Sequence, residues 1–569
     1  DITPLTASVA GASCSVSPGL PSGLSIDSST CTISGTPTSP STNQTYTITA
    51  VMNGVTYQTT VWLSSAYLPL TPSVEGAHLI LDEAMTNITF QYNASAADTY
   101  NGNGTAWMVT DIRSGIGDGS SPSYLTVVGN TLYFRADDGI NGRELWKSDG
   151  TVSGTVMVKD IYSGSDGSSP YHLTAVGSTL YFRADDGING NELWKSDGTA
   201  SGTVMVKDID SGSDSSYPNN FKAVGNTLYF QGDDGTNGTE LWKSDGTASG
   251  TVMVKDIKSG GSGSSPGDFT VVGNTLYFVA DDGINGDELW KSDGTASGTV
   301  MVKDIYSGSD DSESDYLTAI GNTLYFRATD GTNGEELWKS DGTASGTVMV
   351  KDIHSGGSGN PYSLTAFGNT LYFVAYDTTN GYELWKSDGT ASGTVMVKDI
   401  ASGSGNSAVA HFTVVGNTLF FAASDAGHGN ELWKSDGTAS GTVMVKDINS
   451  GSDSSSPGEF KAFGNTLYFV ADDGTNGEEL WKSDGTASGT VMVQDIYSGS
   501  DDSNPSDLTV LGNKLYFRAD EGTNGRELWI LDPADLTGLS SGSGSGSSSS
   551  SSFAYANDKV SVGTDHSCA

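Results

Sequence analysis

The chain has 569 residues, enough for several domains, and its 68 acidic against 27 basic residues give a formal net charge of −41. Proteins that bind nucleic acid need basic surfaces that displace counterions from phosphate, so this composition argues against nucleic acid and against anionic membrane surfaces as partners. No apolar run of about 18 residues occurs, so we expect no membrane insertion.

Residues 1–66 are predicted to form a small β-sandwich. TYTITAV and TYQTTVWL alternate apolar and polar residues, and Asn53-Gly54 lies between them, which is typical of a hairpin turn. Upstream, the stretch LPSGLSIDSSTCTISGTPT at residues 20–38 resembles the immunoglobulin-like domains of microbial surface proteins, whose signature is Leu-Pro-x-Gly-Leu followed by Gly-Thr-Pro. The resemblance implies a spacer without catalytic residues.

Two of the three cysteines lie in this segment. Cys31 stands where the resembled family most often has Gly, and Cys14 lies 17 residues upstream of it. We therefore predict a disulfide between Cys14 and Cys31 that adds a staple to a small β domain.

Residues 67–106 allow two interpretations. HLILDEAMTNITFQYNASA contains two strand-like runs of a degenerate second β domain, and the turn-rich residues 98–106 favour a linker instead.

The middle of the chain is organised around one repeated stretch, ELWKSDGTASGTVMVKDI. Its tryptophans recur every 48 residues, with a single interval of 47 between Trp338 and Trp385. Such a period indicates a repeat architecture. The tryptophans are Trp146, Trp194, Trp242, Trp290, Trp338, Trp385, Trp433, Trp481 and Trp529.

Each repeat is predicted to contain four short strands. In the first repeat they cover residues 124–129, 130–138, 143–149 and 155–161, all rich in Val, Tyr, Phe, Trp and Thr and bounded by Gly, Asn, Asp or Ser. Four antiparallel strands in this length match a β-propeller blade, and a solenoid of stacked strands is the alternative.

The two ends of the repeat region favour a closed ring. A lone fourth strand at residues 107–112 comes first, and the last repeat has its first three strands but no fourth. A ring needs this complementarity because the shared blade hides edge strands. We predict an all-β chain in which a large propeller of about nine four-stranded blades follows an Ig-like sandwich. Nine exceeds the usual range, so eight blades with an imperfect unit, or an open array, remain alternatives.

The propeller is assigned to residues 107–532, and two further segments follow it. Residues 533–552 are a Ser/Gly-rich linker. Residues 553–569 resemble the start of an RCC1-like repeat, and we expect this truncated segment to be disordered. The matching residues are Val560, Val562, Gly563, His566, Cys568 and Ala569.

The repeated motif itself carries two resemblances. ELWKSDGT is similar to the ELWxxDGT repeat of large secreted or surface-attached microbial proteins, which implies extracellular or cell-surface placement and no established activity. The following turn, with Ser148, Asp149, Gly150 and Thr151, resembles the Asp-box hairpin of sialidases, which implies a structural role.

The loops between the second and third strands are the first candidate for chemistry. Sequences such as DDGINGRE supply the carboxylate and amide oxygens that Ca²⁺ prefers, although the spacing differs from an EF-hand. The alternative is a turn in which Asp and Asn bond to their own backbone. The candidate calcium ligands are Asp137, Asp138, Asn141 and Glu144 in the first repeat and Asp185, Asp186, Asn189 and Glu192 in the second.

The loops that join one repeat to the next are the second candidate, because they vary most. They are predicted to run from the rim to the hub, and they are rich in Ser, Gly and Asp, which suits polar or glycan contacts. Plain solvated connections are the alternative. The larger side chains assigned to these loops are Tyr162, His172, Tyr217, Tyr306, His354 and Tyr497.

The sequence shows no single asymmetric constellation of the kind catalysis requires, and it lacks the arginine cluster and the Tyr/Glu pair expected of sialidases. We expect a non-enzymatic extracellular adhesion or recognition protein, with the propeller as a binding platform for a glycan or protein ligand. The alternatives are a secreted glycan-processing enzyme, suggested by the Asp-box-like turns, and a purely structural matrix component.

Overall fold

The structure is a computed structural model that describes residues 105–533, apart from residues 116 and 118, and the backbone of eight strands before them. The chain divides into two compact units, one made of Asp1–Tyr100 with Ser540–Ala569 and the other of Asn101–Leu539. All regular elements in the described residues are strands. No described helix is long and apolar enough to cross a membrane.

The first unit contains two antiparallel sheets, with strand orders β1-β4-β5 and β2-β3-β8-β7-β6. The predicted hairpin is confirmed, since Met52 of β4 pairs with Val55 of β5 and leaves Asn53-Gly54 as the connection. Ile33 of β3 pairs with Ile88 of β8, so strands from the region interpreted as linker or second domain extend one sheet. The strands are β1 (Ser13–Ser17), β2 (Leu24–Ile26), β3 (Ile33–Gly35), β4 (Gln44–Met52), β5 (Val55–Leu63), β6 (Ser73–Val74), β7 (Ala77–Ile80) and β8 (Asn87–Gln91).

Several predictions for the termini lie outside the described residues. Cys31 is not among the described residues, so the disulfide between Cys14 and Cys31 stays a prediction. The Ser/Gly linker after residue 533 and the RCC1-like segment at 553–569 stay predictions for the same reason.

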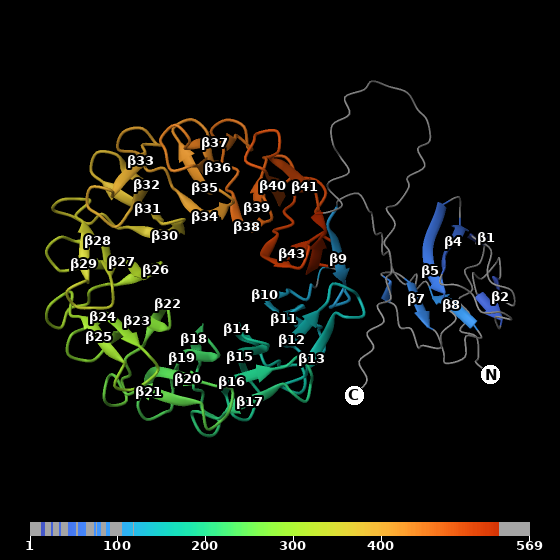
Figure 1. Cartoon of the computed structure of the whole chain (residues 1–569), viewed down its shortest axis with the longest axis horizontal. Coiled ribbons are helices and arrows are strands. Elements are labelled where there is room, and N and C mark those ends of the chain that lie inside the picture. The colour runs from blue at the N-terminus through green and yellow to red at the C-terminus, as the bar shows by residue number, and fades with distance from the viewer. Residues whose placement is uncertain are drawn as a thin grey trace. The chain divides into compact units, whose positions relative to one another are not determined.

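The second unit is a ring of nine four-stranded antiparallel blades built from the described residues, as predicted (Figure 1). In each blade the first strand is innermost and the fourth lies at the rim. We number the blades 1 to 9 in chain order, beginning with the sheet of β10. The innermost strands are β10 (Ser123–Val128), β14 (Tyr171–Val176), β18 (Asn219–Val224), β22 (Gly267–Val272), β26 (Asp315–Ile320), β30 (Tyr362–Phe367), β34 (Ala410–Val415), β38 (Gly458–Phe463) and β42 (Ser506–Leu511).

The second and third strands form the middle of each blade. The second strands are β11 (Thr131–Asp137), β15 (Thr179–Asp185), β19 (Thr227–Asp233), β23 (Thr275–Asp281), β27 (Thr323–Thr329), β31 (Thr370–Asp377), β35 (Thr418–Asp425), β39 (Thr466–Asp472) and β43 (Lys514–Asp520). The third strands are β12 (Arg143–Ser148), β16 (Asn191–Ser196), β20 (Thr239–Ser244), β24 (Asp287–Ser292), β28 (Glu335–Ser340), β32 (Gly381–Ser387), β36 (Gly429–Ser435), β40 (Glu478–Ser483) and β44 (Arg526–Leu531).

The outermost strands explain how the ring closes. Eight of them follow the third strand of their own blade: β13 (Val156–Lys159), β17 (Val204–Lys207), β21 (Val252–Lys255), β25 (Val300–Lys303), β29 (Val348–Lys351), β33 (Val395–Lys398), β37 (Val443–Lys446) and β41 (Val491–Gln494). Blade 9 takes its outer strand from the start of the ring, where β9 (Trp107–Thr110) pairs with β44. The predicted closure by the N-terminal strand is therefore confirmed.

The core lies between neighbouring blades. One cluster joins Tyr133 and Leu145 of blade 1 to Leu180, Phe182 and Trp194 of blade 2, and equivalent clusters recur around the ring. Leu180 and Phe182 are fully buried, and burying such a side chain contributes about 1.5–3 kcal/mol. Blades are thus held to each other by the same apolar residues that build their middle strands.

Polar contacts at the rim reinforce this packing. Lys147 Nζ donates a hydrogen bond to the Gly198 carbonyl of the next blade at 2.9 Å. Lys159 Nζ donates to the Thr203 carbonyl at 2.9 Å and lies 5.6 Å from the ring centre of Trp194. Because these residues belong to the repeated motif, the same links occur at most blade boundaries.

Candidate functional site

The glutamate of each Glu-Leu-Trp motif is a buried clamp. Glu144 is fully buried, and its carboxylate accepts hydrogen bonds from the backbone amides of Ile161, Tyr162 and Ser168 at 3.1, 3.2 and 2.8 Å and from the Ser168 hydroxyl. These donors belong to the connection that leads to blade 2. The clamp therefore fixes the path of the chain from the rim to the hub.

Glu192 repeats this arrangement, with the amides of Ile209 and Ser216 at 2.9 and 3.0 Å and the Ser216 hydroxyl at 2.6 Å. Burial raises the pKa of Glu192 to about 7 in spite of these hydrogen bonds. In blade 9, Glu527 clamps the first connection of the ring by accepting from the Ser120 amide at 2.7 Å. The clamp therefore also helps to close the ring.

The aspartates proposed as calcium ligands bond within their own turn. Asp138 Oδ1 accepts from the Ile140 and Asn141 amides at 2.9 and 2.8 Å, and its Oδ2 accepts from Asn141 Nδ2 at 2.7 Å. These bonds lower the pKa of Asp138. Asp137 accepts from the Gly139 amide at 2.7 Å and pairs with Arg113. Each of these oxygens therefore already has a partner.

Blade 2 has the same turn. Asp185 accepts from the Gly187 amide at 2.7 Å, and Asp186 accepts from the Asn189 amide and side chain at 2.8 Å each. Glu144 and Glu192 bind the connections between blades and not these turns. The proposed calcium ligands are thus not gathered into one set, and the described residues contain no group of three or more His, Cys, Asp or Glu side chains placed to hold a metal.

The turn after the third strand matches its Asp-box-like interpretation. Asp149 Oδ1 accepts from the Thr151 amide at 2.9 Å and the Thr151 hydroxyl at 2.7 Å. Ser148 and Thr155 join their hydroxyls across the turn at 2.7 Å. All of these bonds are local, so the motif stabilises the hairpin.

The larger side chains of the connecting loops mainly support neighbouring turns. Tyr162 packs so closely on Gly187 of the next blade that a Cβ there would lie 2.5 Å from its ring. Tyr306 and Tyr497 cover Gly331 and Gly522 in the same way. His354 Nδ1 donates a hydrogen bond to the Ser358 carbonyl at 3.1 Å. Tyr217, by contrast, is 60% exposed.

His172 lies on the innermost strand β14, so the prediction that it belongs to a connecting loop is wrong. It belongs to a set of equivalent residues that hold a left-handed backbone conformation, with φ between 53° and 59°. Each occupies a bulge, where the register of the first strand shifts against the second. The residues are Tyr124, His172, Asn220, Asp268, Tyr316, Ser363, His411, Glu459 and Asp507.

These bulge positions are chemically unusual. Glycine adopts a left-handed conformation without strain, whereas a residue with a side chain is destabilised there by about 1–2 kcal/mol. None of the nine described positions is glycine, and their side chains range from Tyr and His to Asp and Glu. Such retained strain is typical of functional positions.

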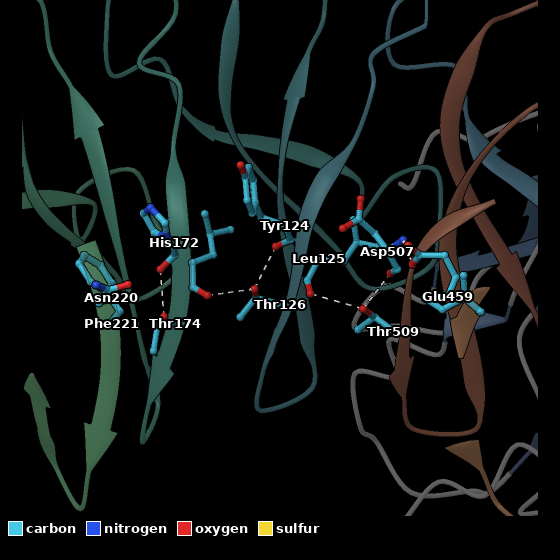
Figure 2. A pocket seen from close by; sticks show the side chains of 12 residues that line it. Tyr124, Leu125, Thr126, His172, Thr174, Asn220, Phe221, Glu459, Asp507 and Thr509 are labelled. Carbon is cyan, nitrogen blue, oxygen red and sulfur yellow. Dashed lines mark hydrogen bonds between the residues drawn. The ribbon is translucent and has the colours of Figure 1, made fainter. Parts of the chain in front are cut away.

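Five of the bulge residues line a pocket of about 530 Å³ at the hub, which we call the hub pocket (Figure 2). The wall is made by the innermost strands of blades 8, 9, 1, 2 and 3. The five are Tyr124, His172, Asn220, Glu459 and Asp507. The wall also contains Leu125, Leu173 and Leu508, which follow three of these bulges, and Phe221, which follows Asn220.

Threonines in the wall of the hub pocket fix the backbone of the innermost strands. Thr126 Oγ1 donates to the Tyr124 carbonyl at 2.9 Å and to the Leu173 carbonyl of blade 2 at 3.2 Å. Thr509 Oγ1 contacts the Leu125 carbonyl at 3.4 Å, across the closure of the ring (Figure 2). These bonds join neighbouring innermost strands and leave the bulge side chains to form the surface.

The side chains of the hub pocket offer hydrogen bonds of both kinds. Burial and the nearby Arg183 lower the pKa of His172, so its imidazole is neutral at pH 7. Burial raises the pKa of Asp507, and the charge of Arg518 acts in the opposite direction. Tyr124 is 37% exposed and presents a phenol. A neutral imidazole, an amide, a phenol and two carboxyl groups suit a small polar ligand.

Comparison with known proteins identifies the N-terminal segment. Residues 2–65 match the family described as Putative Ig domain, which confirms the resemblance predicted for this part of the chain. No curated protein matches the sequence.

Solved structures are similar at low identity. Prolyl oligopeptidase B from Galerina marginata is 10% identical, with a TM-score of 0.34 over 62% of this chain and 55% of that one. A puromycin-hydrolyzing peptidase from Mycobacterium tuberculosis is 10% identical, with a TM-score of 0.34 over 73% and 61%. A prolyl endopeptidase is 13% identical, with a TM-score of 0.33 over 63% and 52%. The chain thus spans between half and about three fifths of their lengths.

The prediction of an adhesion or recognition protein, with the ring as a platform for a glycan or protein, is wrong on this comparison. The similar structures named above are peptidases, and a puromycin hydrolase is also among the similar structures. At no more than 13% identity and TM-scores no higher than 0.34, these proteins lend no activity to this chain.

Of the bulge residues that line the hub pocket, the sequence predicted only His172 as a candidate, although a signal for the others was present. The residue two positions before the Thr or Lys in the middle of each innermost strand, in runs such as YLTVV, HLTAV and NFKAV, differs between most repeats while its surroundings repeat. The bulge that points these residues to the hub depends on pairing with the second strand, which the sequence pattern does not specify.

Proposed function

We propose that the ring is a non-catalytic binding propeller that holds one small polar molecule in the hub pocket. The observation that carries this proposal is the set of left-handed bulges, where side chains are kept in spite of strain and differ from blade to blade. A volume of about 530 Å³ lies within the range of small-molecule sites, about 300–1,000 Å³.

The chemistry of the lining supports binding without catalysis. In the described part of the chain, the residues that line the hub pocket include no Ser, Cys or Lys that could act as a nucleophile beside His172. The threonine hydroxyls of Thr126 and Thr509 donate to backbone carbonyls. The polar groups that remain suit recognition of a ligand through hydrogen bonds.

A matched pair of histidines tests the proposal. His172 lines the hub pocket and packs 6.0 Å from Phe221, and His411 occupies the same bulge in blade 7, outside the pocket lining, 5.9 Å from Phe460. A library of small polar metabolites would be screened against the full chain by ligand-observed NMR, and each hit would be titrated against both alanine variants.

We expect His172→Ala to weaken a hit by about tenfold, the loss of one or two hydrogen bonds. His411→Ala should leave the affinity unchanged. The proposal is overturned if no compound binds the native chain, or if the two variants weaken binding equally.

We also propose that the blades are ELWxxDGT repeats of an extracellular protein. Support comes from the motif at the third strand and following turn of blades 1 to 8, and from its local structural use at Asp149. Extracellular detection of the full-length protein on intact producing cells, by protease accessibility, would test this placement.

A further inference from the structure

Arginine is distributed unevenly around the ring. The chain has seven arginines, and six lie in blades 9, 1 and 2 or directly after β9. Four arginines of the ring occupy one equivalent position on the second strand, opposite the first residue of the innermost strand. They are Arg135, Arg183, Arg327 and Arg518.

Blade 5 shows how this position is normally neutralised. Arg327 Nε and Nη2 donate to the two carboxylate oxygens of Asp315 at 2.9 and 2.6 Å. Its Nη1 pairs with Glu335 Oε2 at 2.9 Å. One guanidinium is therefore met by two carboxylates, one from the innermost strand and one from the third strand.

Both carboxylates are missing in blades 1 and 2. At the position of Asp315 stand Ser123 and Tyr171, as the pairing with Arg135 and Arg183 shows. At the position of Glu335, the first residue of the third strand, stand Arg143 and Asn191, so the site in blade 1 gains a second cation. Blade 9 has the same pattern as blade 1, with Ser506 at the position of Asp315 and Arg526 at the position of Glu335.

Arg135 of blade 1 and Arg183 of blade 2 have no ion-pair partner within the described residues. Arg135 Nε donates to Ser123 Oγ at 3.1 Å, and its Nη1 is buried without a partner, as is Arg183 Nε. Burial lowers the pKa of Arg183. A half-buried guanidinium that forms no ion pair is costly, and for Arg135 the charge of Asp507 in the hub pocket offsets part of this cost.

Tyrosine rings hold these cations in place. The guanidinium carbon of Arg135 lies 4.9 Å from the ring centre of Tyr124 and 4.5 Å from that of Tyr171. The guanidinium carbon of Arg183 also lies 4.9 Å from the ring centre of Tyr171. Stacked guanidinium planes are pre-organised for planar anions, because they lose little freedom when they bind. A hydrogen bond from Arg135, followed by the charge of Arg135, lowers the pKa of the Tyr171 phenol.

The stack borders the hub pocket. Tyr124 lines the hub pocket and contacts Arg135, and the charge of Arg183 reaches His172, which also lines it. Arg143 and Arg526 are exposed. A ligand in the hub pocket can therefore extend a charged group towards these arginines.

We propose that the arginine stack of blades 1 and 2 binds a carboxylate of a small organic acid, in the place that Asp315 and Glu335 fill in blade 5. The inference rests on the proposed function of the hub pocket and names the charge of its ligand. In this proposal the carboxylate oxygens take hydrogen bonds from guanidinium nitrogens of Arg135 and Arg183 that have no partner within the described part of the chain, and the exposed Arg143 adds attraction.

The test compares succinate with its neutral diamide, succinamide, at constant ionic strength. Thermal unfolding of the full chain is followed for the native protein, the Arg135→Gln/Arg183→Gln variant and the control Arg327→Gln. A ligand that binds only the folded state raises the Tm as its concentration rises. The readout is the shift caused by succinate, so a change in basal stability of a variant does not affect it.

We expect succinate, and not succinamide, to stabilise the native chain and the Arg327→Gln control. In the double variant the apparent affinity should fall by at least about tenfold. Equal shifts in all three proteins, or no shift of the native chain at about 50 mM succinate, overturn the inference. If succinate fails while a neutral compound binds with dependence on His172, the proposed function stands and its anionic ligand does not. If succinate binds through the arginines but His172→Ala has no effect on any hit, the proposed function of the hub pocket is overturned instead.

Discussion

Two regions of the ring differ in how their residues vary from blade to blade. We call the buried clamp glutamates and the turns after the third strands the frame, and the left-handed bulge positions of the innermost strands the wall. In the frame, Glu192 of blade 2 and Glu527 of blade 9 make the same buried clamp on the next connection. On the wall, the equivalent bulge positions of these blades hold His172 and Asp507. The frame keeps residues that stabilise each blade, and the wall keeps strained residues that differ. Stability and binding are therefore assigned to separate parts of the same repeat.

The largest expected effect is a pH dependence of stability that comes from the frame. Burial raises the pKa of the clamp carboxyl to about 7 at Glu192, Glu288, Glu336, Glu383 and Glu527. Since the unfolded pKa is about 4.5, the associated stability is complete below about pH 4.5 and is lost as the pH rises through about 7. One pKa unit corresponds to about 1.4 kcal/mol, and five clamps act together, so the urea midpoint should fall clearly from about pH 5 to 8.

The turns of the frame act in the acid range. Hydrogen bonds from Thr199 lower the pKa of Asp197, and equivalent aspartates repeat this around the ring. A lowered pKa gives stability that is present above about pH 3.8 and is lost at lower pH. Stability should therefore peak near about pH 4.5–5. A midpoint that rises between about pH 5 and 8 would contradict the clamp, and Glu192→Gln should make the decline shallower.

Removal of one clamp should have the next largest effect. Glu192→Ala leaves the Ile209 amide and the amide and hydroxyl of Ser216 buried without their acceptor. Each unsatisfied group costs about 1–3 kcal/mol, so we expect a loss of about 3–5 kcal/mol in the free energy of unfolding at pH 7. Urea unfolding followed by tryptophan fluorescence measures this loss.

Asp214→Ala, an exposed residue of the same connection, is the control and should change the free energy by less than about 0.5 kcal/mol. If Glu192→Ala proved as mild as the control, the clamp would not hold the connection. The same experiment with Ca²⁺ present separates the two roles considered for Glu192, because a calcium ligand would make the loss depend on the ion.

The frame could be predicted from the sequence because its interactions repeat. The lone strand at the start and the missing strand at the end predicted the pairing of β9 with β44, and the Asp149 turn follows from residues two apart. Glu144 was read as a possible calcium ligand because its sequence neighbours are Asp and Asn. Its hydrogen-bond partners in the structure lie 17 to 24 residues further along, where the connection returns to it.

The wall could not be predicted to the same extent. The bulge residues depend on a register shift between the first and second strands, and no local motif marks that shift. The arginine cluster was missed because its members are far apart in sequence: Arg518 and Arg135 come together only when blade 9 closes on blade 1, where Arg518 Nη1 donates to the Pro122 carbonyl. The contacts of the frame can thus be predicted from the repeats, whereas those of the wall depend on how the blades meet in the closed ring.

The smallest expected effect separates the wall from the frame most sharply. Ser363 occupies the bulge of blade 6 with φ of 54°, and its side chain lies outside the hub pocket lining. Ser363→Gly relieves left-handed strain of about 1–2 kcal/mol and adds about 0.4–1 kcal/mol of unfolded-state entropy, so stability should rise by about 1 kcal/mol or less. Urea unfolding of the variant against the native chain gives the sign, and Gly368→Ala, at φ of 60° in the same blade, should have the opposite one. A clear loss for Ser363→Gly would mean that the wall residues are kept for stability, and the assignment of strain to binding would then be withdrawn.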